Sequence, residues 1–173
     1  MDVKVEDIKL TNVKRILDEY ALKFQELVKT KMQEKDSKGW NRVASGNLLA
    51  SIKTSIEIGN EKYTVYLHSK EYLKFLEEGR GPGKFPPPDK MLQWVRDKKL
   101  PTKESTGNKE LPREKSLAYL IGKRISEHGT KPYPIVANTQ EELNEIYTGK
   151  LEEALLEDIR AWLPIIHISL RFS

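Results

Sequence analysis

Hydrophobic residues recur every three or four positions in three stretches of this chain, which is the pattern of amphipathic helices. These stretches are residues 11–35, 113–127 and 138–159. Thr11 or Asn12 can cap the start of the first helix. Gly129, a residue type that is common just beyond helix C-termini, follows the second. The pattern therefore predicts three long helices.

Alternation of hydrophobic and polar residues predicts β-strands elsewhere in the chain. Residues 51–58 alternate, residues 63–67 are β-branched or aromatic, and a turn between them makes an antiparallel hairpin. Residues 165–172 alternate again, and one face of this predicted strand carries Ile166, Ile168, Leu170 and Phe172. The strand belongs to a C-terminal arm of residues 163–173. It either completes the sheet of the hairpin or reaches a neighbouring copy.

Glycine and proline dominate residues 79–88, where Gly79, Gly81, Gly83 and Pro82 precede three consecutive prolines. Such a composition does not form regular secondary structure, so we expect a projecting loop with a set shape. Short helices at 71–78 and 89–98 flank this loop, and Asp89 can cap the second of them. Residues 99–112 are polar and contain two prolines, which indicates a mobile loop.

Together these elements predict an α+β fold in a single domain of residues 1–173. A small twisted antiparallel sheet is packed by three long helices, with an extended loop and a C-terminal strand arm. No apolar run approaches the roughly 20 residues that a membrane span needs. The first ten residues have no apolar signal-peptide core, and the absence of cysteine excludes disulfides and thiolate metal sites. These features favour a cytosolic location or a particle assembled in the cytosol.

The chain has a net charge of +4, and its charges are unevenly distributed. Residues 80–103 contain seven basic and two acidic residues, whereas residues 141–158 contain seven acidic residues and one basic residue. One basic and one acidic segment on the same chain can attract each other between copies. The alternative interpretation is two solvated faces with no partner.

The sequence contains no motif that indicates a catalytic, cofactor-binding or metal-binding site. His68, His128 and His167 are not at metal-ligand spacing, and the glycines of residues 79–83 match no nucleotide-binding motif. Nucleic-acid binding is the better alternative, because basic residues with aromatic ones among them lie over residues 80–99. This candidate patch contains Arg80, Lys84, Arg96, Lys98 and Lys99, with Phe85 and Trp94. The competing interpretation packs Trp94 in the core and leaves the lysines as ordinary surface.

Four segments resemble, in order, motifs of the head–tail joining or tail-completion proteins of tailed bacteriophages. They are SGNLLASI at 45–52, YLKFLEEGRGP at 72–82, LQWVRDK at 92–98 and IGKRISEHGTKPYP at 121–134. With the long first helix, the resemblance extends from about Asn12 to Ile159. The chain departs from the family at Ile135, where a Phe is usual, and in its run of three prolines and its C-terminal strand.

The resemblance implies a virion structural protein without enzymatic activity or cofactor. Such proteins are assembled in the host cytoplasm and form rings of six or twelve copies at the neck, between the portal or connector and the tail. The resemblance allows contact between the ring and DNA in its channel, and it does not imply binding to a membrane. The residues that we expect at subunit or partner contacts are Gly79, Arg80, Gly81, Pro82, Lys84, Phe85, Arg96, Glu141, Glu145, Glu152, Ile166, Ile168, Leu170 and Phe172.

Overall fold

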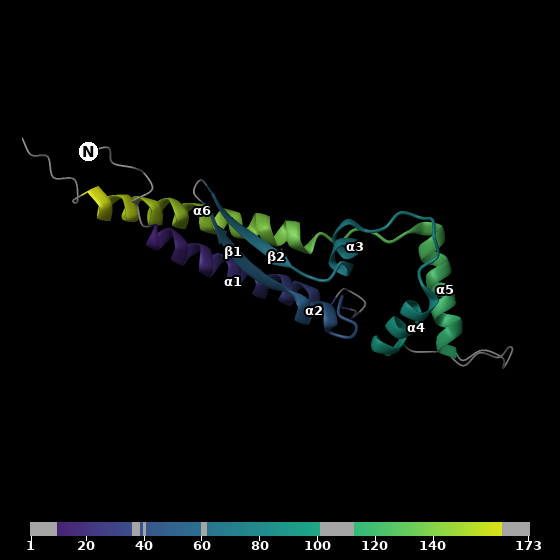
Figure 1. Ribbon diagram of the computed structural model, residues 1–173. Helices are drawn as coiled ribbons and strands as arrows, with labels where there is room; N and C mark the ends of the chain where they lie inside the picture. Colours follow the sequence, from purple (N-terminus) through teal and green to yellow (C-terminus); the bar gives the residue numbers. More distant parts are fainter. Residues whose placement is uncertain (1–9, 36–38, 40, 60–61, 101–112, 164–173) are drawn as a thin grey trace, which may run out of the picture. The chain divides into compact units, whose positions relative to one another are not determined.

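The computed structural model describes residues 10–35, 39, 41–59, 62–100 and 113–163 (Figure 1). Within these residues the chain forms six helices and one two-stranded antiparallel sheet, which confirms the α+β fold class. The elements in chain order are α1 (Thr11–Gln33), α2 (Asn47–Ser51), β1 (Lys53–Ile58), β2 (Tyr63–His68), α3 (Tyr72–Glu78), α4 (Pro88–Asp97), α5 (Arg113–His128) and α6 (Ile135–Trp162).

The chain divides into two compact units. Unit 1 contains residues 1–28, 53–68 and 138–173, and unit 2 contains residues 29–52 and 69–137. The hairpin of β1 and β2 therefore shares unit 1 with most of α1 and α6, whereas α5 belongs to unit 2 together with α4. Helix α5 packs on α4 within unit 2, so the predicted packing of three long helices on one sheet is not confirmed.

In unit 1, α1 and α6 form an antiparallel pair. Asn144 of α6 accepts a hydrogen bond from Tyr20, and Asp158, further along α6, accepts hydrogen bonds from Asn12 near the start of α1. The Tyr20 and Tyr147 rings meet edge to face with their centroids 5.4 Å apart. The buried side chains of this pair include Ile16, Phe24, Val28, Leu143, Tyr147 and Ala154. Their spacings of four, seven or eight residues place them on one side of each helix and make one apolar seam.

The hairpin lies against α1 through one of its two faces. Thr54 stands opposite Leu67, Ile56 opposite Val65, and Ile58 opposite Tyr63. Thr54 fixes β1 to the helix, because its hydroxyl donates to the carbonyl of Ala21 and its backbone N–H donates to the side chain of Gln25, both at 3.1 Å. The other face is polar, and there the hydroxyl of Ser55 pairs with Nε2 of His68 at 2.7 Å.

Unit 2 is built around the packing of α4 on α5, with Val95 and Ala118 buried between them and their neighbours. Helix α4 begins at Pro88 and not at Asp89, and Pro88 occupies one of the first two helical positions, where a missing N–H costs no hydrogen bond. The prediction that Asp89 caps this helix is therefore wrong, although its carboxylate still lies in the first turn and suits the helix dipole.

Helix α6 begins three residues earlier than predicted, at Ile135 instead of 138. The carboxylate of Glu77 in α3 accepts hydrogen bonds from the backbone N–H groups of Val136 at 3.0 Å and Ala137 at 2.8 Å. Residues 131–134 are not helical, as their prolines predict. Glu77 thus satisfies two of the donors that the start of a helix leaves unpaired.

Two predicted segments lie outside the described residues. They are the C-terminal strand at 165–172 and most of the predicted mobile loop, residues 101–112. In the described part of the chain, no helix has the length and apolar character needed to cross a membrane.

Candidate functional site

The predicted contact residues fall into two groups in the structure. Residues 79–85 and Arg96 belong to unit 2, whereas Glu141, Glu145 and Glu152 belong to unit 1. Ile166, Ile168, Leu170 and Phe172 lie outside the described residues.

The Gly/Pro loop, residues 79–88, is pinned at its start by a short antiparallel bridge. The N–H of Arg80 donates to the carbonyl of Thr130 at 3.0 Å, and the N–H of Thr130 donates back at 2.7 Å. Gly79 and Gly129 flank this bridge with φ values of 73° and 70°, which disfavour residues with a side chain. A Cβ on Gly129 would also collide with the carbonyl oxygen of Arg80. The two glycines therefore allow the backbones to meet.

The same loop is held a second time at the C-terminal end of α5. The N–H of Gly83 donates to the carbonyl of Ser126 at 2.7 Å, one of the carbonyls that the last turn of a helix leaves free. The guanidinium of Arg80 donates to the carbonyl of Lys84, which closes the loop on itself. Backbone hydrogen bonds therefore hold the loop at two points, once to Thr130 and once to the end of α5. The exposed residues of this segment are Gly81, Pro82, Gly83, Lys84, Pro87 and Pro88.

Phe85 anchors the end of the loop on α5. Gly122 of α5 makes room for its ring, since a Cβ at Gly122 would lie 2.5 Å from the ring tip. The Phe85 ring also stacks on the ring of Tyr119, with centroids 5.7 Å apart, and Pro86 is buried behind it. Sequence reasoning selected Phe85 for its aromatic type, but neither Tyr119 nor Gly122 carried a signal that linked it to the loop.

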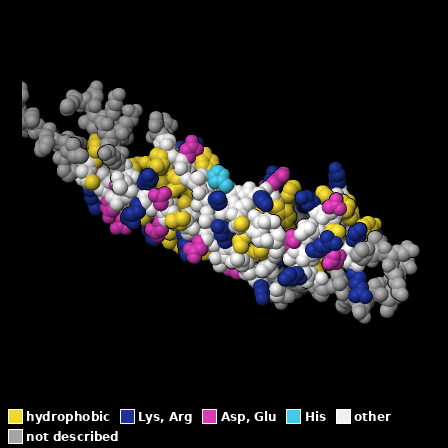
Figure 2. Space-filling model, turned by 60° about the horizontal axis from the view of Figure 1, so that its bottom comes forward, with side chains coloured by type: hydrophobic (Ala, Val, Ile, Leu, Met, Phe, Trp, Pro, Cys, Tyr) yellow, Lys and Arg dark blue, Asp and Glu magenta, His cyan; other side chains and the backbone are white. Residues whose placement is uncertain are grey.

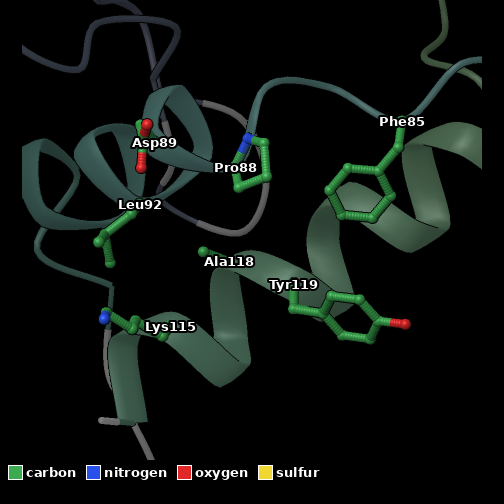
Figure 3. Close-up of a pocket in the computed structure, with 7 residues that line it drawn as sticks. All are labelled: Phe85, Pro88, Asp89, Leu92, Lys115, Ala118 and Tyr119. Atoms are coloured by element: carbon green, nitrogen blue, oxygen red, sulfur yellow. The ribbon is translucent and has the colours of Figure 1, made fainter. Parts of the chain in front are cut away.

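A cavity of about 240 Å³ opens beside Phe85, between the start of α4 and α5 (Figure 3). In the close-up, Leu92 of α4 faces the part of α5 that carries Lys115 and Ala118, and Phe85 and Tyr119 lie on the other side of Ala118. Asp89 and Lys115 are the charged residues of the lining. The volume is below the roughly 300–1,000 Å³ of typical small-molecule pockets. We conclude that this Phe85 cavity suits one or two apolar side chains better than a cofactor.

The basic residues predicted near the loop do not form one free patch. Arg96 pairs with Glu114 of α5 at 2.8 Å, and the ammonium group of Lys98 donates to Asn41 at 2.6 and 3.1 Å. Arg80 is engaged with the loop backbone. Lys84 is exposed, and no described residue pairs with its ammonium group. Trp94 is half-buried, so it is neither a fully buried core residue nor a fully exposed one.

The second group forms an acidic face on α6. Residues advance by about 100° around a helix, so the spacings of four and seven place Glu141, Glu145 and Glu152 within about 40° of each other. The buried seam of α6, which contains Leu143, Tyr147 and Ala154, lies on the opposite side of the helix. All three glutamates are exposed, and none has a hydrogen bond or ion pair with a described residue.

An apolar residue also belongs to the acidic face. Leu156 follows Glu152 by four residues, which places it on the same side of α6, and 52% of its surface is exposed. The view in Figure 2, which brings the lower side of Figure 1 forward, shows exposed hydrophobic side chains among charged ones there as well. An exposed acidic face of this kind can complement a basic surface on a partner, and Leu156 adds an apolar side chain to it.

His68 and Glu77, which the sequence offered as candidates for metal or acid–base chemistry, have structural contacts. No cluster of three histidine or acidic side chains among the described residues has a metal-binding arrangement. His68 is bonded to Ser55, and His128 lies in the last turn of α5. Glu77, which is adjacent to Glu78 in the sequence, serves as the cap of α6.

No family model, no curated protein and no solved structure matches this chain.

Proposed function

We propose that this chain is a virion structural protein that forms a ring at the head–tail junction of a tailed bacteriophage. It would join the portal or connector to the tail and have no enzymatic role. The order of four sequence motifs supports the family, and the acidic face of α6 supports assembly. That face is exposed opposite the buried seam and carries Leu156 in addition to its glutamates.

A ring requires two unlike surfaces on each copy, because one patch meets a different patch of the next copy. The acidic face of α6 is one such surface. The exposed part of the Gly/Pro loop, with Lys84 at its edge and the Phe85 cavity beside it, is the other. Opposite charges would set the orientation of neighbouring copies, and an apolar side chain in the cavity would supply the buried anchor.

The fixed backbone of the loop favours a permanent interface between neighbouring copies. A loop that is already held by its bridge to Thr130 and its bond to Ser126 loses little conformational freedom when a neighbour covers it. Pre-organisation of this kind lowers the entropic cost of assembly at each of the repeated contacts in a ring.

Native mass spectrometry of the purified protein tests the proposal. We expect closed assemblies of six or twelve copies, either alone or after addition of portal or tail proteins. A protein that stays a monomer in all of these mixtures would contradict it. Electron microscopy of the same samples distinguishes rings from open chains of subunits.

A charge-reversal pair identifies the surface. Glu145→Lys with Glu152→Lys is expected to weaken assembly at least tenfold, because it places like charges across the contact. Glu34→Lys with Glu71→Lys makes the same change in net charge at exposed sites outside α6 and is the matched control. Adding Lys84→Glu to the first pair should restore part of the assembly. Equal effects of the two pairs would reject the acidic face as the contact.

Nucleic-acid binding gains no support from the described residues. Two of the five basic residues of that hypothesis, Arg96 and Lys98, are bound to Glu114 and Asn41. Arg80 is bound to the backbone of Lys84.

A further inference from the structure

The outer edge of β1 presents backbone groups that no strand pairs. The N–H of Thr54 points away from β2, because it donates to Gln25 of α1, and the N–H of Gly59 points toward β2, because it donates to Lys62. Inward and outward residues alternate along an antiparallel strand. Ile56 and Ile58 therefore point their N–H and C=O groups outward, as Thr54 does, and no described residue bonds them.

A groove runs beside this edge in unit 1. It has a volume of about 400 Å³ and is lined by residues of α1, including Ala21 and Leu22, and by residues of β1, including Ile56 and Ile58. Leu22 and Ile58 are 67% and 51% exposed, so two large apolar residues beside the free edge are largely uncovered. An unpaired strand edge beside apolar side chains is the arrangement that accepts an added strand.

The C-terminal segment of the chain has the alternating sequence of a strand that could add to this edge. Residues 165–172 alternate, with Ile166, Ile168, Leu170 and Phe172 on one face and polar or basic residues between most of them. An added strand pairs through its backbone and places alternate side chains against the groove. The apolar face of this segment can cover Leu22 and Ile58, and its other face stays in water.

The end of α6 places the segment at the correct side of unit 1. Asp158 contacts Asn12 and Val13 in the first turn of α1, so the chain leaves α6 beside the start of α1 (Figure 1). The groove begins at Lys14, one residue beyond Val13, and ends near Thr54. Ten residues follow Leu163, and an extended chain of that length spans at most about 33–36 Å. The segment can therefore turn back and follow the groove.

We propose that residues 165–172 add to the outer edge of β1 of their own chain as a third, antiparallel strand. Because the segment enters at the Ile58 end and runs toward Thr54, its direction is opposite to that of β1. The added strand binds the free N–H and C=O groups of Ile56 and Ile58 and covers Leu22. This proposal concerns a single copy, so it does not rest on the assembly proposed above.

Amide hydrogen exchange followed by NMR tests the added strand in the full chain. Ile56 and Ile58 are expected to exchange at least tenfold more slowly in the full chain than in a variant that lacks residues 164–173. Ser55 and Glu57, whose N–H groups point toward β2, should be protected in both proteins. Val65 on the outer edge of β2 should exchange equally in both. Rapid exchange of Ile56 and Ile58 in the full chain would overturn the proposal.

Point variants keep the test valid if the shortened chain does not fold. Ile168→Glu with Leu170→Glu places charges on the apolar face and should release the Ile56 and Ile58 amides. His167→Glu with Arg171→Glu alters the other face of the same segment and should leave them protected. The same effect from both pairs would contradict the predicted face.

Disulfide trapping distinguishes a strand of the same chain from one of a second copy. The chain has no cysteine, so Leu22→Cys can be combined with a single cysteine at 166, 168, 170 or 172 without side reactions. At least one of these pairs should form an intramolecular disulfide under mild oxidation, and partners at 167, 169 or 171 should not. A Leu120→Cys control, exposed on α5, should not react with the segment. Covalent dimers from the Leu22→Cys pairs would overturn the assignment to the same chain.

Discussion

The carboxylate of Asp158 in α6 accepts a hydrogen bond from the backbone N–H of Val13 in the first turn of α1, with Oδ2 and N 3.0 Å apart. Its other oxygen accepts from the backbone N–H and the side-chain amide of Asn12. Asp158 is only 4% exposed. A residue near the end of the chain therefore caps the first helix, and its negative charge complements the helix dipole.

Replacement of Asp158 by alanine should lower the free energy of unfolding by about 1–3 kcal/mol, because the buried N–H of Val13 loses its acceptor. Urea denaturation monitored by circular dichroism measures the change. The control is Glu157→Ala, which removes an exposed neighbouring carboxylate of the same helix. If both variants have the same stability, Asp158 does not act as the cap.

The bridge between Arg80 and Thr130 makes Gly129 sensitive to substitution. Gly129→Ala should destabilise the protein by more than about 1 kcal/mol, since φ is 70° and the new Cβ would strike the carbonyl oxygen of Arg80. Gly149→Ala is the matched control, because nothing lies within 4 Å of a Cβ there and the residue is inside α6. It should stabilise the helix by about 0.5–1 kcal/mol. Thermal unfolding of both variants checks the opposite signs.

Phe85 and Gly122 should be energetically coupled. Gly122→Ala alone is expected to destabilise unit 2, because the added methyl group meets the Phe85 ring at 2.5 Å. In a Phe85→Ala background the same change should be neutral or stabilising. A double-mutant cycle in urea measures the coupling, which we expect to be about 0.5–3 kcal/mol. Additive effects would show that the loop does not rest on this part of α5.

Stability should fall at high pH through Tyr147. Burial, together with the hydrogen bond that its hydroxyl donates to Glu19, raises the pKa of Tyr147 to about 12 from an ordinary value of 10.0. The folded state thus favours the protonated phenol, so this contribution to stability is complete below pH 10 and is lost as the pH rises through 12.

Tyr147→Phe should remove part of that pH dependence. The variant has no phenol to ionise at this position, so its stability should fall less between pH 10 and 12 than that of the unchanged protein. Tyr20, whose pKa is also raised by burial, should contribute to the pH dependence that remains in this variant. Urea unfolding at several pH values gives the comparison, with Tyr119→Phe at an exposed site as control. An unchanged slope in the Tyr147 variant would refute the assignment.

Local patterns predicted most of the secondary structure. The seam of α1, the alternation of β1 and the proline-rich segment before α6 each depend on neighbouring residues, and their boundaries agree with the structure to within a few positions. The errors lie at helix ends. Asp89 was expected to cap α4 and Asn138 to begin α6, but Pro88 fits the first turn and Glu77 caps α6 from another helix.

The sequence predicted only part of the candidate contact surfaces. The spacing of Glu141, Glu145 and Glu152 was sufficient to place them on one face of a helix. The conformation of the Gly/Pro loop was not predictable, because it depends on Thr130, Ser126 and Gly122, which lie far along the chain from the loop. The composition of the loop indicated an irregular segment, but it did not indicate which residues elsewhere in the chain bind that segment.

By itself, the sequence determined the types of element, the uneven charge and the absence of cysteine chemistry, because these follow from residue identity and short-range periodicity. Only the tertiary structure decided that the chain divides into two compact units and that Asp158 and Glu77 cap helices from a distance. It also decided that the loop lies on α5 and that the outer edge of β1 is open beside Leu22. The physical reason is that each of these features is a contact between segments far apart in the chain. Such a contact depends on how complete elements pack, and no local pattern encodes it.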